Sequence, residues 1–255
     1  MHLSASTPVL VSGGASGLGE AVVRRMRRVE CPVAILDLDV ERGARVAQET
    51  GALFLRVDVT DAASVREAIA QAGAAQGAPR LAVTCAGIAP GAKTVGKGIA
   101  HDPALFAKAI SINLLGAFHV ASIAAEAMVA ADPLSDDGER GVIVNTASVA
   151  AYEGQIGQVA YAASKGAVAA MTLPMARDLS REGVRVMAIA PGLFKTPMLE
   201  GLPQDVQESL GKTVPFPARL GDPAEFAMLV QHIARNSMMN GEVIRLDGAI
   251  RMAAR

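Results

Sequence analysis

Three side chains in the middle of the sequence have types and spacing suited to proton transfer: Ser148, Tyr161 and Lys165. If Tyr161 and Lys165 share a helix, their four-residue spacing places both on one face, with Cβ atoms about 5–6 Å apart. A phenol has an ordinary pKa of about 10, so ionising it near pH 7 costs about 4 kcal/mol. A positive charge about 5 Å away offsets roughly 3 kcal/mol of this at an effective dielectric constant of about 20, but less than about 1 kcal/mol in water. The pair therefore predicts a catalytic site only if it lies in a sheltered pocket.

Ser148 follows an apolar run, 141–147, that is typical of a buried strand. Its hydroxyl would then emerge at the carboxyl end of that strand, where open α/β sheets bind ligands. Taken alone, each of the three residues is more often a helix cap, an amphipathic filler or a solvated charge. The catalytic interpretation therefore depends on a second site that gives a phenolate something to act on.

A glycine-rich turn near the start of the chain predicts such a site. An apolar run at 8–11 leads into Ser12-Gly-Gly-Ala-Ser-Gly-Leu-Gly19, and a helical pattern follows. Gly13, Gly17 and Gly19 would let the backbone approach a pyrophosphate at the N-terminus of this helix, where free N–H groups and the helix dipole favour anions. The alternative for the turn alone is an ordinary loop.

Asp37 ends the second expected strand, 31–37, about 20 residues after the glycine turn, at the position suited to a ribose diol. A 2′-phosphate would be repelled by Asp37, and Ala15, Ser16 and Leu38 offer no cation to bind it. We therefore expect NAD rather than NADP. The alternative is a solvated acid at the end of a strand.

Composition narrows the class of protein. The chain of 255 residues is 51% hydrophobic and has a net charge of −1, with 24 basic and 25 acidic residues. This balance favours a small-molecule partner over nucleic acid or a membrane surface, and no apolar run approaches the roughly 20 residues that cross a bilayer. Two cysteines, and no room for a signal peptide before the first strand, lead us to expect a cytoplasmic protein. The four histidines show no metal-ligand spacing, so we expect no metal.

Five further apolar runs alternate with helical patterns. They lie at 53–57, 81–87, 141–147, 184–190 and 241–247. Seven strands separated by helices predict one α/β domain over residues 1–255, with a doubly wound parallel sheet and helices on both faces.

Three segments around this sheet carry further expectations. The helical pattern over 102–130 contains Asn113, and both this helix and the helix of Tyr161 have more apolar surface than one neighbour can cover, so we expect an oligomer. Pro174 should kink the second helix beyond Lys165. The segment 193–218, punctuated by prolines and glycines, is expected to be a loop that covers the substrate.

Other residues have two possible roles at this point. Asp58 either contacts an adenine or caps the next helix, as Asp61 also could. Cys85 is expected to pack rather than to act as a nucleophile, because no base accompanies it. Lys93 and Lys97 lie in a glycine-rich segment that is either an ordinary solvated loop or a flexible rim that attracts an anionic substrate.

The chain resembles the short-chain dehydrogenase/reductase family over nearly its whole length, in an ordered set of motifs: Ser12-Gly13-x-x-x-Gly17-x-Gly19, Asp37, Asp58, Ala86-Gly87, Asn113, Ser148, Tyr161-x-x-x-Lys165 and Pro191-Gly192. Within the family, the segments 145–155, 189–194, 215–225 and 240–252 are similar to type II 3-hydroxyacyl-CoA dehydrogenases. The resemblance implies a Rossmann-fold enzyme that reversibly oxidises 3-hydroxyacyl-CoA to 3-oxoacyl-CoA with NAD, usually as a homotetramer. Ser12 in place of the usual threonine and Cys85 in place of asparagine depart from the general family pattern.

The resemblance also implies a role for each site residue. Tyr161 would take the hydroxyl proton, Lys165 would lower the pKa of Tyr161, Ser148 would hold the substrate oxygen, and Asn113 would hold a relay water. The implied substrate contacts are Ser148, Gln155, Gln158 and Tyr161. The implied cofactor contacts are Ser12, Gly13, Ser16, Gly17, Leu18, Gly19, Asp37, Asp58, Val59, Cys85, Ala86, Gly87, Tyr161, Lys165, Pro191, Gly192, Phe194 and Thr196.

The sequence leaves other functions open. Hydroxysteroid dehydrogenase and 3-oxoacyl reductase activities use the same catalytic residues, although Asp37 disfavours an NADPH-dependent synthetic role. A nucleotide-binding structural subunit of a larger complex is an alternative of another class. A second hypothesis is that Lys93 and Lys97 attract the phosphates of CoA.

Overall fold

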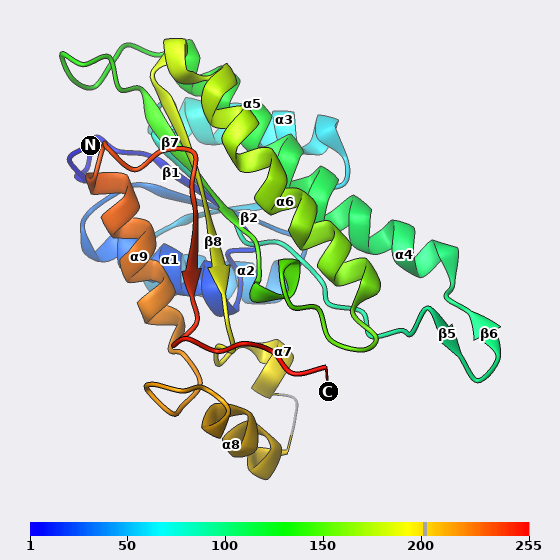
Figure 1. Ribbon diagram of the computed structural model, residues 1–255. Helices are drawn as coiled ribbons and strands as arrows, with labels where there is room; N and C mark the ends of the chain where they lie inside the picture. Colours follow the sequence, from blue (N-terminus) through cyan, green and yellow to red (C-terminus); the bar gives the residue numbers. More distant parts are fainter. Residues whose placement is uncertain (201–202, 255) are drawn as a thin grey trace.

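The protein is built on one parallel sheet. A computed structural model describes residues 1–200 and 203–254, and seven of its strands form a sheet in the order β3-β2-β1-β4-β7-β8-β9 (Figure 1). Its strands are β1 (Val9–Ser12), β2 (Val33–Asp37), β3 (Leu53–Arg56), β4 (Leu81–Thr84), β7 (Gly141–Thr146), β8 (Val184–Pro191) and β9 (Val243–Leu246). All neighbouring pairs are parallel, which confirms the predicted doubly wound sheet. The strand order reverses between β1 and β4, so a ligand crevice is expected at their carboxyl ends.

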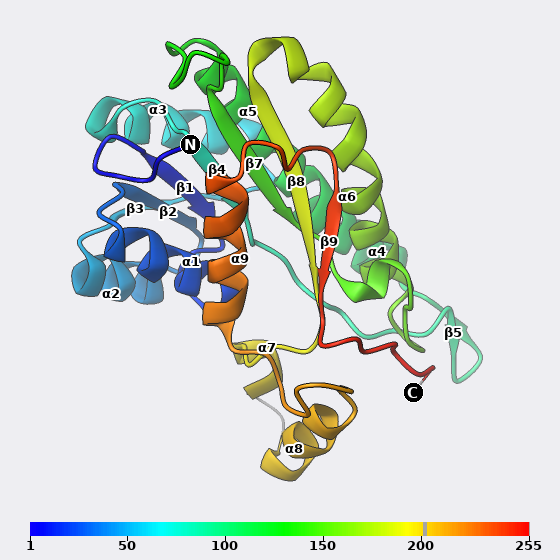
Figure 2. The same cartoon turned by 60° about the vertical axis from the view of Figure 1, so that its left-hand side comes forward.

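Helices cover both faces of the sheet (Figures 1 and 2). One face carries α1 (Gly17–Arg28), α2 (Val40–Thr50) and α9 (Pro223–Arg235), and the other carries α3 (Ala62–Gln76), α5 (Gly116–Val129) and α6 (Val159–Asp178). Successive side chains of a strand enter the two cores in turn, as Val9 and Val11 pack with the first set of helices and Leu10 with the second. Burial on both faces explains why the strands are continuous apolar runs in the sequence.

The helix expected over 102–130 has three parts. Asp102 caps α4 (Pro103–Ile110) by accepting a hydrogen bond from the Ala104 N–H, a π-helical turn follows (Ser111–Leu115), and α5 continues to Val129. The extent of the helix was therefore predicted correctly. The π-helical turn was not, because no residue type in it marks such a turn.

By length and composition alone, Pro103–Val129 could cross a membrane, with a mean hydropathy of 1.5. The sequence-based statement that no apolar run approaches this length was therefore wrong. In the structure, α5 packs against β4, β7 and α3, and its buried side chains, including Val120 and Met128, belong to the core on that face of the sheet. This packing explains only part of the apolar character of the segment, because 33% of its most apolar window is buried.

Two segments expected to be loops contain regular structure. The glycine-rich segment 89–101 forms a hairpin of β5 (Val95–Gly96) and β6 (Ile99–Ala100), and the segment 193–218 contains α7 (Pro197–Glu200) and α8 (Gln204–Lys212). Gly201 and Leu202, which belong to the second segment, lie outside the described residues. The loop predictions were wrong here because prolines and glycines at the ends of short elements were taken as signs of a continuous loop.

The helix of Tyr161 and Lys165 is uninterrupted around the pair. It runs from Val159 to Asp178 and continues through Pro174, so the four-residue register of the two side chains is kept. Two short 3₁₀ turns, Val149–Ala151 and Ser180–Glu182, precede and follow it. The first of these turns begins at Ser148, which brings the end of β7 close to the start of α6.

Candidate active site

One cavity of about 870 Å³ opens at the carboxyl ends of β1, β2, β4, β7 and β8. It gathers nearly all the residues predicted from the sequence. Those that line it are Gly13, Ser16, Gly17, Leu18, Gly19, Asp37, Asp58, Val59, Cys85, Ala86, Gly87, Ser148, Gln155, Gln158, Tyr161, Lys165, Pro191, Gly192, Phe194 and Thr196. Ser12 and Asn113 do not line it and are buried behind its wall.

At two of its glycines, the turn packs too closely for a side chain. A Cβ atom on Gly19 would lie 2.1 Å from the carbonyl oxygen of Gly13, and one on Gly13 would lie 2.5 Å from the backbone nitrogen of Ala86. Gly13 and Gly17 also have positive φ angles of 67° and 54°, which disfavour other residues. Ser16 precedes α1, and its hydroxyl makes no capping bond within the described part of the chain. The turn therefore presents backbone N–H groups and a hydroxyl to an anion at the N-terminus of α1.

Asp37 is fixed by the backbone around it. Its Oδ2 accepts a hydrogen bond from the Ala15 N–H at 3.0 Å, and its Oδ1 accepts one from the Asp39 N–H at 3.0 Å. Each carboxylate oxygen can accept more than one bond, and Asp37 lines the cavity at the end of β2. A carboxylate oriented in this way suits a pair of neighbouring hydroxyls. Together with the glycine turn, it makes this half of the cavity fit a dinucleotide.

Asp58 does not cap the next helix. That role belongs to Asp61, whose Oδ1 accepts a hydrogen bond from the Ala63 N–H at 2.9 Å. Asp58 Oδ1 instead accepts bonds from the hydroxyl and the N–H of Thr60 at 2.7 and 2.9 Å, and these bonds lower the pKa of Asp58. Asp58 thus fixes the turn at Thr60 and also lines the cavity, so its contact with an adenine stays a prediction.

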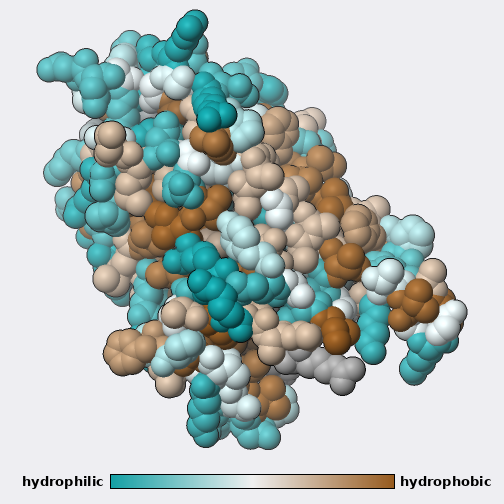
Figure 3. Space-filling view, in the orientation of Figure 1, coloured by the Kyte–Doolittle hydropathy of each residue, from teal (hydrophilic) through white to brown (hydrophobic). Residues whose placement is uncertain are grey.

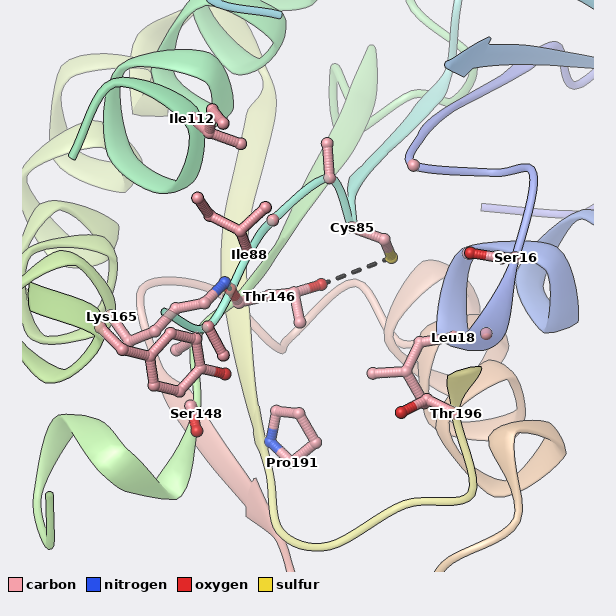
Figure 4. A pocket seen from close by; sticks show the side chains of 18 of the residues that line it. Ser16, Leu18, Cys85, Ile88, Ile112, Thr146, Ser148, Lys165, Pro191 and Thr196 are labelled. Carbon is pink, nitrogen blue, oxygen red and sulfur yellow. Dashed lines mark hydrogen bonds between the residues drawn. The ribbon is translucent and has the colours of Figure 1, made fainter. Parts of the chain in front are cut away.

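Ser148 and Lys165 lie together at the end of the cavity opposite Ser16 and Leu18 (Figure 4), and Tyr161 lines the same cavity. The ammonium of Lys165 donates a hydrogen bond to the Thr146 carbonyl at 2.6 Å and lies 6.0 Å from the centre of the Tyr161 ring. Ser148 Oγ accepts a hydrogen bond from the Ala150 N–H at 3.1 Å, and its own O–H can donate to Tyr161, with which it is hydrogen-bonded. Three groups able to exchange or donate protons therefore face one space.

Burial controls the protonation of this cluster. It raises the pKa of the Tyr161 phenol, and a hydrogen bond with Ser148 opposes the rise. Burial also lowers the pKa of Lys165 to about 8. In the ligand-free protein, burial therefore outweighs the Ser148 hydrogen bond, and the net shift of the Tyr161 pKa is upward. That Lys165 lowers the pKa of Tyr161 stays a prediction. The sheltered pocket that the pair requires also makes the phenolate harder to form.

Asn113 lies in the π-helical turn, and its side chain is fully engaged. Its Oδ1 accepts a hydrogen bond from the Ile88 N–H at 2.8 Å, and its Nδ2 donates to the Ile88 carbonyl at 2.8 Å and to Ser164 Oγ at 3.0 Å. Ser164 Oγ in turn donates to the Tyr161 carbonyl at 2.7 Å. The side chain therefore connects the end of β4 to the catalytic helix. Both of its N–H groups are used, so it has none left for a relay water.

Cys85 stands at the end of β4 with its sulfur 3.5 Å from Thr146 Oγ1 (Figure 4). Burial raises the pKa of this thiol to about 11, so it stays protonated near neutral pH and is a poor nucleophile. The departure from asparagine at this position leaves a weak contact between β4 and β7. Behind it, Ser12 Oγ is buried without a hydrogen-bond partner in the described part of the chain.

The rest of the cavity wall includes Lys108, Ile112, Leu199, Leu210 and Met252. Leu199 and Leu210 belong to the segment 193–218 that was expected to cover the substrate, and Lys108 and Ile112 belong to the helix expected over 102–130. Met252, in the last segment of the chain, was missed, because only the folded structure brings it there.

Lys93 and Lys97 are exposed in the β5–β6 hairpin, and neither lines the cavity. In the described ranges 1–200 and 203–254, no group of three or more potential metal ligands occurs. The side chains that line the cavity suit proton transfer at one end and binding of an anion and a diol at the other.

Comparisons with known proteins agree with this geometry. The family model described as short chain dehydrogenase matches residues 7–207. The 3-hydroxyacyl-CoA dehydrogenase type-2 proteins of Drosophila melanogaster and Homo sapiens are 51% and 50% identical over 247 residues, 95% of this chain and 96% and 94% of theirs. The crystal structure of 3-hydroxyacyl-CoA dehydrogenase type-2 from Mycobacterium avium covers 100% of both chains with a TM-score of 0.94 at 42% identity. The chain belongs to the short-chain dehydrogenase family of oxidoreductases.

Proposed function

We propose that this enzyme oxidises 3-hydroxyacyl-CoA to 3-oxoacyl-CoA reversibly, with NAD as the hydride acceptor. The observation that carries the proposal is the convergence of Ser148, Tyr161 and Lys165 at one end of a cavity whose other end holds Asp37 and the glycine turn. The similarity to 3-hydroxyacyl-CoA dehydrogenase type-2 proteins supports the substrate class.

NAD is proposed because of Asp37. Members of the family use NAD or NADP, and the two differ by a phosphate on the adenosine ribose. A carboxylate held by two backbone N–H groups accepts hydrogen bonds from a free diol and repels that phosphate. The glycine turn would hold the pyrophosphate, and Asp58 and Val59 would contact the adenine. When bound, NAD supplies the ring carbon that accepts the hydride.

At the other end, the residues of the chain would manage the proton. In the oxidation direction, the Tyr161 phenolate takes the proton of the substrate hydroxyl while Ser148 donates a hydrogen bond to the same oxygen as it becomes a carbonyl. Lys165 would bind the nicotinamide ribose and place a positive charge beside Tyr161. Because burial raises the pKa of Tyr161, the phenolate should form only when bound NAD adds the positive charge of its nicotinamide ring nearby.

The nucleotide part of an acyl-CoA substrate would lie at the mouth of the cavity. The β5–β6 hairpin is attached next to the substrate end, where the Ala92 N–H donates to the Gly157 carbonyl at 2.8 Å. Lys93 and Lys97 would then face the entrance, where phosphates of CoA remain outside. Reversing both charges should raise KM for acetoacetyl-CoA but not for a truncated thioester without the nucleotide, and equal effects on the two would refute the role.

A homotetramer is proposed from the outer surface. Hydrophobic side chains gather along α6 (Figure 3), where Val159 and Leu173 are 41% and 44% exposed, and Leu115 and Phe118 on the neighbouring helix are each 46% exposed. A stripe of this kind on paired long helices is typical of a subunit contact. Sedimentation of the purified protein tests this, and a stable monomer would contradict it.

The activity is tested by following absorbance at 340 nm with acetoacetyl-CoA and either NADH or NADPH. We expect rapid loss of NADH and slow loss of NADPH. The control is Asp37→Ser, which should lower kcat/KM for NADH and raise it for NADPH, reducing their ratio roughly 100-fold through loss of the diol bonds and of the repulsion. No reaction of the wild type with either cofactor would refute the proposed substrate class.

A further inference from the structure

The last segment of the chain, residues 248–254, lies against the segment that joins Ser148 to Tyr161. Figure 2 shows it leaving β9 and crossing below α6 towards the β5–β6 hairpin. Three hydrogen bonds fasten the two segments: Ile156 N–H to the Ala254 carbonyl at 3.0 Å, Gln155 Nε2 to the Ala253 carbonyl at 3.1 Å, and Met252 N–H to Glu153 Oε2 at 3.1 Å. We call residues 248–254 the C-terminal segment.

A bidentate ion pair stands behind this contact. Arg245 of β9 donates to both oxygens of Glu153 at 2.8 and 3.1 Å. The same guanidinium donates to Asp247 Oδ2 at 2.7 Å and to the Ile250 carbonyl at 2.9 Å, and it lies 5.5 Å from the ring of Tyr152. The side chains of Arg245 and Glu153 are only 23% and 22% exposed. A planar, bidentate and mostly buried pair is stronger and more rigid than a surface pair.

Glu153 therefore holds two parts of the cavity at once. It lies five residues after Ser148 and eight before Tyr161, and its second oxygen also binds the backbone of Met252. Met252 lines the cavity together with Gln155 and Gln158. The hydrogen bonds from Arg245 lower the pKa of Glu153, so the carboxylate stays ionised across the neutral range.

We propose that Glu153 is a positioning residue that clamps the C-terminal segment onto the Ser148–Tyr161 segment, and that Met252, held in this way, is the side chain that limits the length of the acyl group. The proposal rests on the proposed acyl-CoA activity for its substrate. The clamp itself does not, because it is a contact between two parts of the chain.

The clamp is tested first without any substrate. Hydrogen exchange of the ligand-free protein reports how often the Ile156 and Met252 N–H groups lose their partners. Glu153→Gln keeps the size of the side chain and removes its charge, so exchange at these two amides should become roughly 10-fold faster. Glu225→Gln is the matched control, because it removes the same charge from a bidentate pair with Arg219 at 2.7 and 2.9 Å in another part of the protein. It should leave these two amides unchanged, and equal exchange in wild type and Glu153→Gln would overturn the clamp.

Kinetics then separate positioning from a general structural role. In Glu153→Gln, KM for acetoacetyl-CoA should rise roughly 10-fold with kcat and the Kd for NADH within about 2-fold, because the wall of the substrate site is loosened while the reacting groups remain. If Glu153→Gln does not fold, Arg245→Lys replaces it, since lysine keeps the charge but cannot make the bidentate contact. A parallel loss of NADH binding in the folded variant would mean a global effect and overturn the positioning role.

Met252 is tested with a pair of substrates. Met252→Ala should raise kcat/KM for 3-oxodecanoyl-CoA relative to acetoacetyl-CoA roughly 10-fold, since removing several buried atoms enlarges an apolar pocket. An unchanged ratio would overturn the role of Met252. If the wild type reduces neither substrate, the proposed function fails, while the exchange experiment still decides the clamp.

Discussion

The two halves of the cavity are built in different ways. The half with Asp37 and the glycine turn is made by β1, α1, β2 and β4, which follow one another closely in the chain, and its contacts are mostly backbone to backbone or backbone to carboxylate. The half with Tyr161 is completed by α7, α8 and the C-terminal segment, and side chains such as Glu153 and Arg245 hold it together. The first half recognises a ligand by geometry that only glycine permits. The second depends on side chains that can be exchanged without rebuilding the fold.

This difference separates what substitutions should do. A change in the backbone-built half should affect binding of the cofactor, and through it every reaction. A change in the side-chain-built half should affect the proton step or the choice of substrate and leave cofactor affinity intact. The following variants test this separation.

The largest effect is expected for Tyr161→Phe. Removing the phenol hydroxyl removes the proton acceptor and leaves the ring in place, so kcat should fall by about 10²–10⁴-fold. The Kd for NADH, measured by fluorescence titration, should change less than about 2-fold. Substantial remaining turnover would show that another group transfers the proton.

Gly19→Ala, in contrast, should weaken the binding of the cofactor. Its Cβ would lie 2.1 Å from the Gly13 carbonyl oxygen, so the turn must shift, and NADH affinity should fall roughly 100-fold even if the protein folds. Gly73→Ala in α3 is the control, since nothing lies within 4 Å of its Cβ position. It should stabilise the protein by about 0.5–1 kcal/mol and leave NADH binding unchanged. Similar NADH affinities in the two variants would contradict the claim that the backbone of the glycine turn forms the cofactor site.

Lys165→Met should separate stability from function. Burial lowers the pKa of Lys165 from 10.5 to about 8, so keeping it charged below pH 8 costs folding free energy. The variant should lose activity, but its unfolding free energy at pH 7 should rise by about 1–3 kcal/mol. The loss of the hydrogen bond to the Thr146 carbonyl reduces this gain. Between pH 8 and 10.5, Lys165 loses its proton in the folded wild type while it keeps it in the unfolded chain, so the wild type becomes more stable. The stability advantage of Lys165→Met over the wild type should therefore shrink in this range. An equal difference at all pH values would refute the cost of burial.

A smaller effect is expected from pH. In the reduction direction Tyr161 must be protonated, and its raised pKa keeps it so. The first group to lose its proton is then Lys165, so kcat/KM for reduction should be level near neutral pH and fall above about pH 8. Oxidation should instead become faster as pH rises through the range where Tyr161 ionises. A kcat/KM for reduction that decreases as the pH is lowered below 7 would contradict these protonation states.

The comparison also explains what could be predicted from the sequence. The sheet and the glycine turn could, because their signals are local: apolar runs, three glycines in one turn, and an acid at the end of the next strand. The shared helix of Tyr161 and Lys165 was a condition of the catalytic interpretation, and α6 fulfils it.

What could not be predicted depends on contacts between distant residues. Met252 meets Glu153 across a separation of 99 residues, and no pattern near either residue indicates the pairing. The two hydrogen bonds between the Asn113 side chain and the Ile88 backbone depend on a π-helical turn that no sequence pattern indicates. Burial is the largest cause of the pKa shifts of Tyr161 and Lys165, and the depth of burial depends on the packing of the whole cavity. These are properties of the folded cavity as a whole.

The most direct test of this account is a crystal structure of Tyr161→Phe with NAD and 3-hydroxybutyryl-CoA. We predict that Asp37 accepts hydrogen bonds from the adenosine ribose, and that the substrate hydroxyl lies about 2.6–3.2 Å from Ser148 Oγ beside the missing phenol oxygen. An acyl group bound elsewhere, or a ribose that does not contact Asp37, would contradict the division of the cavity into a cofactor half and a substrate half.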